Sequence, residues 1–203
     1  MLKNKYNLKL LDIKKKNNCK IVITGGPGSG KTEIINSLLK KNFYCFEEIS
    51  RQIIRPKRLM GIKNFFSEKP IEFSKILIKK RKQQYIESSK ISLSKKKPVI
   101  FFDRGLHDIF AYLNYKKKSY DHIKFKLENY PYDMAFILPP WKEIYKTDSE
   151  RKETFQESIL IFNYIKNIYK ENKIKLFEIK PDTVENRVLQ ILHNLKLNNL
   201  INF

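Results

Sequence analysis

Eight consecutive residues, GGPGSGKT at positions 25–32, have the types and the spacing of a phosphate-binding loop. The pattern G-x-x-x-x-G-K-[ST] lets backbone N–H groups turn inward and surround phosphate oxygens. In this pattern Lys31 reaches the β- and γ-phosphates and Thr32 ligates Mg²⁺. A strand-like run precedes the motif and a helix-like run follows it. We therefore predict that ATP and Mg²⁺ bind here, with contacts from Gly25, Gly26, Pro27, Gly28, Ser29, Gly30, Lys31 and Thr32.

A second candidate site is the run VIFFDRG at 99–105, in which four apolar residues end in a carboxylate. Such a run predicts a buried strand with Asp103 at its tip. There the carboxylate would lie beside the phosphate-binding loop and help to hold Mg²⁺. Asp is also favoured as a helix N-cap, and that structural role is the alternative for Asp103. Arg104 follows directly and would stabilise charge on a transferred phosphoryl group, unless it is a surface residue.

Charged residues also follow the strand predicted at 43–46, in the sequence EEISR. A carboxylate at a strand end could accept a proton from an acceptor hydroxyl, and Glu48 is the first candidate, with Glu47 as the alternate. If the segment is helical, Arg51 and Arg55 lie one turn apart and could bind an anionic acceptor. The alternative is an ordinary charged helix start.

The helix predicted over 70–93 carries a stripe of residues that begins apolar and becomes polar. A helix of this kind could line a polar cavity with its later half, and Arg81 and Gln84 are then candidates for substrate contacts. Simple exposure of that half of the helix is an equal alternative. The stripe consists of Phe73, Leu77, Arg81, Gln84 and Ser88.

The segment 139–153 joins a predicted strand to a predicted helix, and we expect it to act as a lid. Arg151 would close on the phosphates and help to expel water. The alternative is an ordinary helix start with solvated charges, capped by Asp148 or Ser149.

These residues need a scaffold that brings strand ends together. Strands that are apolar throughout alternate with helices, which predicts an α/β fold with a parallel sheet covered by helices on both faces. The helix that begins near residue 47 is expected to break at Pro56. The predicted strands span 20–24, 43–46, 99–102, 132–138 and 174–179, and the other predicted helices span 31–41, 70–93, 106–115, 119–128, 151–171 and 183–197.

Length and composition limit the class of protein. The 203 residues suit one compact domain, and 41% apolar with 13% aromatic residues excludes a disordered chain. The net charge of +21 comes mainly from lysines spread along the sequence, so nucleic acid is an unlikely main partner. No run reaches the roughly 20 apolar residues of a membrane span. Two cysteines fit a reducing compartment, so we expect a cytoplasmic protein, with the oligomeric state left open.

The start of the chain is charged throughout and lacks the apolar core of a signal peptide. We predict that residues 1–19 form an N-terminal extension. Residues 20–203 would then form one P-loop NTPase domain of the kinase-like type, with its lid at about 139–153. No Pro-, Gly- or Ser-rich linker divides this region.

Six short motifs share an order and spacing: GGPGSGKT at 25–32, EEISRQII at 47–54, RKQQY at 81–85, FFDRG at 101–105, PPW at 139–141 and DSERKE at 148–153. Together they resemble the NadR-like, AAA-type predicted ATPase family, a branch of P-loop proteins near the nucleotide kinases. The resemblance covers residues 20–197. It implies a three-layer α/β/α P-loop NTPase fold with a five-stranded parallel sheet, and it implies ATP with Mg²⁺. Glu48 and the Asp103-Arg104 pair also look similar to elements of deoxynucleoside kinases, except at Gly105, where those kinases usually carry serine.

Two functions of different classes follow. The first is a phosphotransferase that moves the γ-phosphoryl group of MgATP to a small-molecule acceptor such as a nucleoside or nucleotide. The acceptor would lie among Glu48, Arg51, Arg81 and Gln84. The alternative is a regulatory ATPase or nucleotide-dependent switch that acts on a protein partner. An acceptor pocket walled by the 70–93 helix would favour the first. GTP is disfavoured because the guanine-binding pattern N-K-x-D is absent.

Overall fold

The computed structural model describes residues 18–59, 61, 65–94, 98–120, 125–146 and 153–201. The described residues form a five-stranded sheet in the order β2-β3-β1-β4-β5, and every neighbouring pair of strands is parallel. This confirms the predicted α/β fold and its five-stranded parallel sheet. The strands are β1 (Cys19–Gly25), β2 (Tyr44–Phe46), β3 (Val99–Asp103), β4 (Met134–Leu138) and β5 (Leu176–Glu178).

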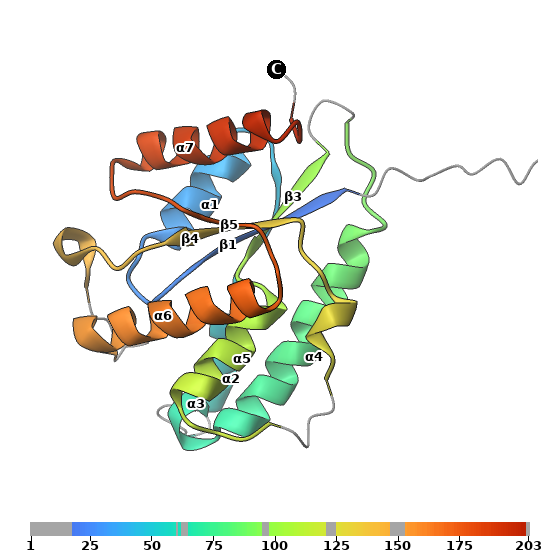
Figure 1. The fold of residues 1–203 in the computed structure, drawn as a ribbon. Coiled ribbons are helices and arrows are strands. Elements are labelled where there is room, and N and C mark those ends of the chain that lie inside the picture. Colours follow the sequence, from blue (N-terminus) through green and yellow to red (C-terminus); the bar gives the residue numbers. More distant parts are fainter. Residues whose placement is uncertain are drawn as a thin grey trace, which may run out of the picture.

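Helices cover both faces of the sheet and complete three layers (Figure 1). In β1, Ile21 and Ile23 join a core with α1 and α7, whereas Val22 joins a second core on the opposite face. Successive side chains of a strand point to opposite faces, so a fully apolar strand requires both cores. The helices are α1 (Lys31–Lys40), α2 (Ser50–Leu59), α3 (Phe65–Glu68), α4 (Pro70–Ser88), α5 (Leu106–Tyr115), α6 (Phe155–Glu171) and α7 (Val184–Leu197).

Two helix predictions differ from the structure at prolines and caps. Helix α2 continues through Pro56, so the predicted break there is wrong. Proline removes one backbone donor, but Gln52 is exposed, so water can bond the carbonyl that would have accepted from it. Helix α6 begins after Thr154, whose side chain accepts from the backbone N–H of Glu157. A cap at Asp148 or Ser149 is therefore also wrong.

Two other predicted helices differ from the structure in length or type. Helix α4 ends at Ser88 rather than near 93. Within the described part of 119–128, a short 3₁₀ turn at Leu127–Asn129 replaces the predicted helix. The first strand begins at Cys19, and the division between 1–19 and 20–203 stays a prediction.

The sheet order determines where the candidate residues meet. Strand β1 lies at the centre, between β3 and β4, with Ile23 opposite Asp103. Because the carboxyl ends of parallel strands share one edge, the loops after β1, β2 and β3 converge there. Within the described ranges, every helix is too short or too polar to cross a bilayer.

Candidate active site

The turn from β1 to α1 forms the glycine-rich loop of residues 25–32. Two of its glycines are required by the geometry. A Cβ on Gly25 would lie 2.4 Å from the carbonyl oxygen of Leu138 on β4. Gly30, the N-cap of α1, adopts a left-handed backbone with a φ of 82°. The loop thus leads directly into a helix N-terminus, whose free N–H groups favour phosphate oxygens.

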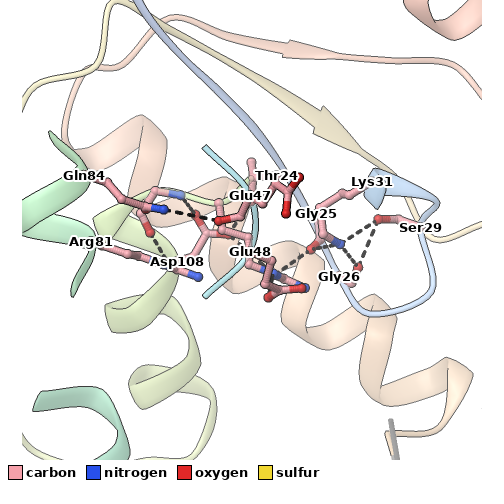
Figure 2. A network of polar contacts seen from close by, with 12 residues as sticks. Thr24, Gly25, Gly26, Ser29, Lys31, Glu47, Glu48, Arg81, Gln84 and Asp108 are labelled. Atoms are coloured by element: carbon pink, nitrogen blue, oxygen red, sulfur yellow. Dashed lines mark hydrogen bonds and ion pairs between the residues drawn. The ribbon is translucent and has the colours of Figure 1, made fainter. Parts of the chain in front are cut away.

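Lys31 lies inside this loop and is 6% exposed. Its ammonium donates hydrogen bonds to the carbonyl oxygens of Gly25 at 3.0 Å and Gly26 at 2.7 Å, and to the hydroxyl of Ser29 at 3.1 Å (Figure 2). Burial, and then the positive charge of Arg104, lower the pKa of Lys31 to about 7. A phosphate group beside this ammonium would favour its charged form, so anion binding and protonation of Lys31 are coupled.

Asp103 is the last residue of β3 and pairs in register with Ile23 of β1. Burial, and then the charge of Glu48, raise the pKa of Asp103 to about 6. Its Oδ1 atom is buried and has no hydrogen-bond partner among the described residues. The N-cap of α5 is Gly105, so the alternative role of Asp103 as a helix cap is wrong.

The unpartnered oxygen of Asp103 fits a hard divalent cation. Sites of this kind hold Mg²⁺ with one or two carboxylates, together with phosphate oxygens and water. Thr32 lies in the first turn of α1 with its side chain exposed, so its hydroxyl is accessible to a cation on a bound nucleotide. Asp103 and Thr32 are therefore the residues that would hold Mg²⁺.

Arg104 and Glu48 form an ion pair at the same edge of the sheet, with Arg104 Nε donating to Glu48 Oε1 at 3.0 Å. Arg104 Nη1 also donates to the carbonyl oxygen of Gly25 at 3.1 Å, which holds the guanidinium against the loop. Its side chain is 10% exposed, which contradicts a surface role. Burial alone would raise the pKa of Glu48, but Arg104 and Lys31 outweigh it and lower that pKa to about 2. Glu48 is therefore anionic at neutral pH.

A cavity of about 140 Å³ opens beside this ion pair, between the sheet edge and helices α2, α4 and α5. Glu48, Arg104 and Pro27 of the glycine-rich loop form its polar end. The predicted acceptor residues Arg51 and Arg81 line it as well. The remaining wall is mainly aromatic and aliphatic and includes Ile54, Phe66, Phe73, Leu77, Ile109 and Tyr112.

Arg81 is the residue by which the polar stripe of α4 reaches this cavity. It is 3% exposed, and its Nη1 donates to the carbonyl oxygen of Gly105 at 2.5 Å. Leu77 and Phe73 line the cavity one and two turns earlier in the helix. The cavity is therefore walled mainly by the earlier half of α4 and not by the later half, which the stripe predicts. Of the polar residues in the stripe only Arg81 lines it, and the alternative of simple exposure is wrong for Arg81.

The structure places other predicted residues elsewhere. Gln84 donates to the carbonyl oxygen of Glu47 at 3.3 Å, and both line a separate groove (Figure 2). Arg55 is exposed on α2 and is not part of the cavity wall. Neither Gln84 nor Arg55 is thus at the cavity to which the sequence assigned it. Arg151 falls outside the described residues, as does part of the predicted lid at 139–153.

Three further residues of this site were not predicted from the sequence. Tyr112 lies beneath the guanidinium of Arg104, 5.6 Å from ring centroid to carbon. Asp108 is a buried carboxylate on α5. Asp108 and Tyr112 are four residues apart on one face of α5, the helix that follows Arg104, and this spacing was a signal in the sequence. Arg187 of α7 donates to the carbonyl oxygen of Ser29 at 3.0 Å, and no local pattern indicates this contact.

Comparison with known proteins assigns the chain to a family. A family model described as an AAA domain matches residues 20–187. No curated protein matches the chain in sequence. Deoxyadenosine kinase from M. mycoides with bound dATP is 17% identical with a TM-score of 0.63, over 87% of this chain and 99% of that one.

Two other solved structures show the same fold. Thymidylate kinase from Candida albicans is 18% identical with a TM-score of 0.62, over 92% of this chain and 96% of that one. The NadR protein in complex with NR is 13% identical with a TM-score of 0.67, over 93% of this chain and 53% of that one. The chain thus corresponds to about half of NadR. These likenesses confirm the P-loop kinase-like fold and the resemblance to NadR-like proteins.

Proposed function

Because the chain belongs to the AAA-domain family of P-loop proteins, we propose that it transfers the γ-phosphoryl group of MgATP to a small-molecule acceptor bound in the cavity. The position of that cavity carries the proposal. Its polar end contains Glu48 and Arg104, and Arg104 is bonded to Gly25 of the phosphate-binding loop. An acceptor in the cavity would therefore lie next to the transferred group. A regulatory ATPase has no need of such a cavity.

Four residues of the site act on the nucleotide in this transfer. The acceptor oxygen bonds to the γ-phosphorus, the bond from that phosphorus to the bridging oxygen breaks, and ADP leaves. Lys31 and Arg104 stabilise negative charge on the phosphoryl oxygens. Asp103 and Thr32 would hold Mg²⁺, which supplies further charge stabilisation when bound.

Glu48 orients the acceptor. With a pKa of about 2 it is a weak base, but an anionic one that accepts a hydrogen bond from an acceptor hydroxyl. The transition state of phosphoryl transfer is loose, so orientation of the hydroxyl contributes more than its early deprotonation. The hydroxyl proton passes to Glu48 as the new bond forms.

The acceptor that suits the cavity is a nucleoside or nucleotide. A planar base would pack against the aromatic and aliphatic wall formed by residues such as Phe66, Phe73 and Tyr112. Arg51 and Arg81 supply donors for the sugar or a phosphate. The structural likeness to deoxyadenosine kinase and thymidylate kinase supports this class.

The test is ADP production from MgATP, with and without a panel of nucleosides, nucleotides and nicotinamide riboside. We expect one compound to stimulate turnover strongly and to appear as a phosphorylated product by mass spectrometry. Lys31→Ala should abolish both signals. Glu48→Gln should reduce transfer at least tenfold while it leaves ATP binding within about threefold.

Two results would contradict the proposal. If Lys31→Ala bound MgATP as tightly as the original chain, the nucleotide site would be wrong. If ATP bound tightly but turnover stayed slow and unchanged across the panel, the chain would instead act as a nucleotide-dependent switch. The next experiment would then be a search for its protein partner.

A further inference from the structure

Asp108 is a buried carboxylate to which the proposed function gives no role, although it borders the cavity. It is 1% exposed. Its Oδ2 accepts hydrogen bonds from the backbone N–H of Gly105 at 2.8 Å and from the hydroxyl of Tyr169 at 2.6 Å. Its Oδ1 accepts from the hydroxyl of Thr24 and lies 3.7 Å from Arg104 Nη1. The carboxylate therefore accepts three hydrogen bonds and forms one longer ion pair with Arg104.

These partners fix Asp108 from several parts of the fold. Thr24 belongs to the central strand β1, Gly105 to the turn after β3, and Tyr169 to α6. Figure 2 shows Thr24 and Asp108 in the same polar network as Glu48 and Lys31. A carboxylate that accepts hydrogen bonds from three parts of the fold cannot move with a ligand. Asp108 therefore presents a fixed negative charge to Arg104.

Glu48 offers Arg104 a different kind of partner. Its side chain is 22% exposed, against 1% for Asp108, and it lines the acceptor cavity. The proposed function requires Glu48 to accept a hydrogen bond from the acceptor, so its bond to Arg104 is then shared. Arg104 also has a left-handed backbone with a φ of 71°, which is uncommon outside glycine. When the bond to Glu48 is shared, the carbonyl oxygen of Gly25 and the carboxylate of Asp108 remain as partners of the guanidinium, and of these two only Asp108 is charged.

We propose that Asp108 is the positioning residue for Arg104. It keeps the guanidinium beside the phosphate-binding loop while Glu48 turns its hydrogen bond towards the acceptor. The inference rests on the proposed function, because the role of Arg104 on the phosphoryl group belongs to that function. Asp108 itself touches neither nucleotide nor acceptor in this scheme.

The substitution Asp108→Asn separates this role from simple support of the fold. The amide oxygen can still accept from Gly105 and Tyr169. The amide NH₂ can donate to the hydroxyl of Thr24, which then acts as acceptor. Asparagine thus presents a donor in place of an acceptor to both Thr24 and Arg104, but only Arg104 has no acceptor with which to answer it. The variant therefore keeps the local hydrogen bonds and removes the attraction on the guanidinium.

The measurement compares turnover with the affinities for MgADP and for MgADP–aluminium fluoride, a mimic of the transferred phosphoryl group. For Asp108→Asn we expect kcat to fall roughly 10- to 100-fold, with the KM for ATP within about threefold. Affinity for the aluminium fluoride complex should fall by a similar factor, and affinity for MgADP should not change. In the double variant of Asp108→Asn and Arg104→Lys, kcat should fall little further than in Asp108→Asn alone, because both substitutions disturb the same interaction.

Tyr169→Phe is the matched control. It deletes one hydrogen bond to the same carboxylate but leaves the contact with Arg104, so we expect kcat within about threefold of the original chain. Equal losses in both variants would overturn the proposal and make Asp108 a purely structural residue. An unchanged kcat in Asp108→Asn would overturn it as well.

If Asp108→Asn does not fold, Asp108→Glu and Asp108→Gln give a second pair that differs only in charge. The kcat of Asp108→Glu should exceed that of Asp108→Gln by about tenfold or more. Equal kcat values would overturn the proposal. The aluminium fluoride measurement needs no acceptor, so it still tests Asp108 if no acceptor is phosphorylated. If the original chain bound the mimic no more tightly than MgADP, Arg104 would not stabilise the transferred group, and this inference would fail with it.

Discussion

Glu48 and Asp103 lie close enough for the charge of one to raise the pKa of the other, yet their own pKa values move in opposite directions. Glu48 receives a hydrogen bond from Arg104 at 3.0 Å, and its pKa falls to about 2. Asp103 keeps a buried oxygen without a partner among the described residues, and its pKa rises to about 6. One carboxylate is therefore satisfied within the fold, and the other is left for a cation. Opposed shifts of this kind commonly mark two carboxylates with separate tasks.

Asp103→Asn should stabilise the metal-free protein while it abolishes activity. The folded state binds the Asp103 proton up to about pH 6, whereas the ordinary pKa is 3.8. The folded chain therefore holds more protons in this window, and stability falls as pH rises from about 4 to 6. The Asp103→Asn variant has no carboxyl group to ionise at this position, so it does not lose this stability as pH rises. We expect a gain of up to about 3 kcal/mol in the free energy of unfolding at pH 7.5, measured by urea without Mg²⁺.

The gain should shrink as pH falls and approach zero below about pH 3, where the original carboxyl is mostly protonated in both states. Glu128→Gln, which changes an exposed carboxylate, is the control and should leave stability within about 0.5 kcal/mol. A loss of stability at pH 7.5 in Asp103→Asn would contradict the assigned pKa shift.

Nucleotide binding should take up a proton at Lys31. The pKa of Lys31 is about 7 in the free protein, and a bound phosphate would raise it. At pH 8, without Mg²⁺, we expect uptake of about one proton per ADP, and affinity that weakens up to tenfold per pH unit above 7. Calorimetry in buffers of different ionisation enthalpy measures the proton directly.

Lys31→Arg provides the comparison for this experiment, because arginine stays charged throughout the range. It should bind ADP with no linked proton uptake near pH 8. The same uptake in both proteins would assign the proton to another group.

Gly105→Ser should destabilise the fold, although kinases that the chain resembles usually carry serine there. A Cβ at Gly105 would lie 2.5 Å from the hydroxyl of Tyr169 and 3.0 Å from the ring of Tyr132. We expect a loss of about 1–3 kcal/mol in thermal or urea unfolding. Gly105→Ala should lose a similar amount, because the clash involves the Cβ. Adding Tyr169→Phe should recover part of the loss, and a purely additive double variant would point to a different cause.

Arg187→Met should weaken ADP binding by roughly tenfold with little change in the acceptor KM. Methionine preserves much of the packing but loses the bond to the carbonyl oxygen of Ser29 and the stacking of the guanidinium on Trp141. Leu189→Ala alters an exposed side chain on the same helix and should have no effect on binding. If both variants bound ADP normally, the contact would not support the loop.

The sequence was sufficient for features whose signal is local. Residues 25–32, the apolar run ending in Asp103, and Glu48 after the second strand all lie where their patterns predict. The capping box of Thr154 and Glu157 also follows a sequence pattern. Asp148 and Ser149 were preferred as caps because they lie just before the helix start predicted at residue 151.

What remained hidden depends on contacts between distant segments. A helical stripe defines a face but not how far along it a cavity extends, which is why Arg81 reaches the cavity and Gln84 does not. Tyr169 meets Asp108 across 61 residues of sequence. Arg187 meets Ser29 across 158 residues. No spacing rule for helices or strands covers such separations.

The central place of β1 has a consequence for synthesis on the ribosome. The first strand to emerge needs β3 and β4 on its two edges, so it must wait for residues 99–103 and then 134–138. Pairings this distant in sequence close slowly. The carbonyl oxygen of Ser29 gains its hydrogen bond from Arg187 only after residue 187 has been made. The nascent chain therefore contains the whole phosphate-binding motif long before it can bind a nucleotide. Nucleotide binding would then indicate that the sheet has assembled.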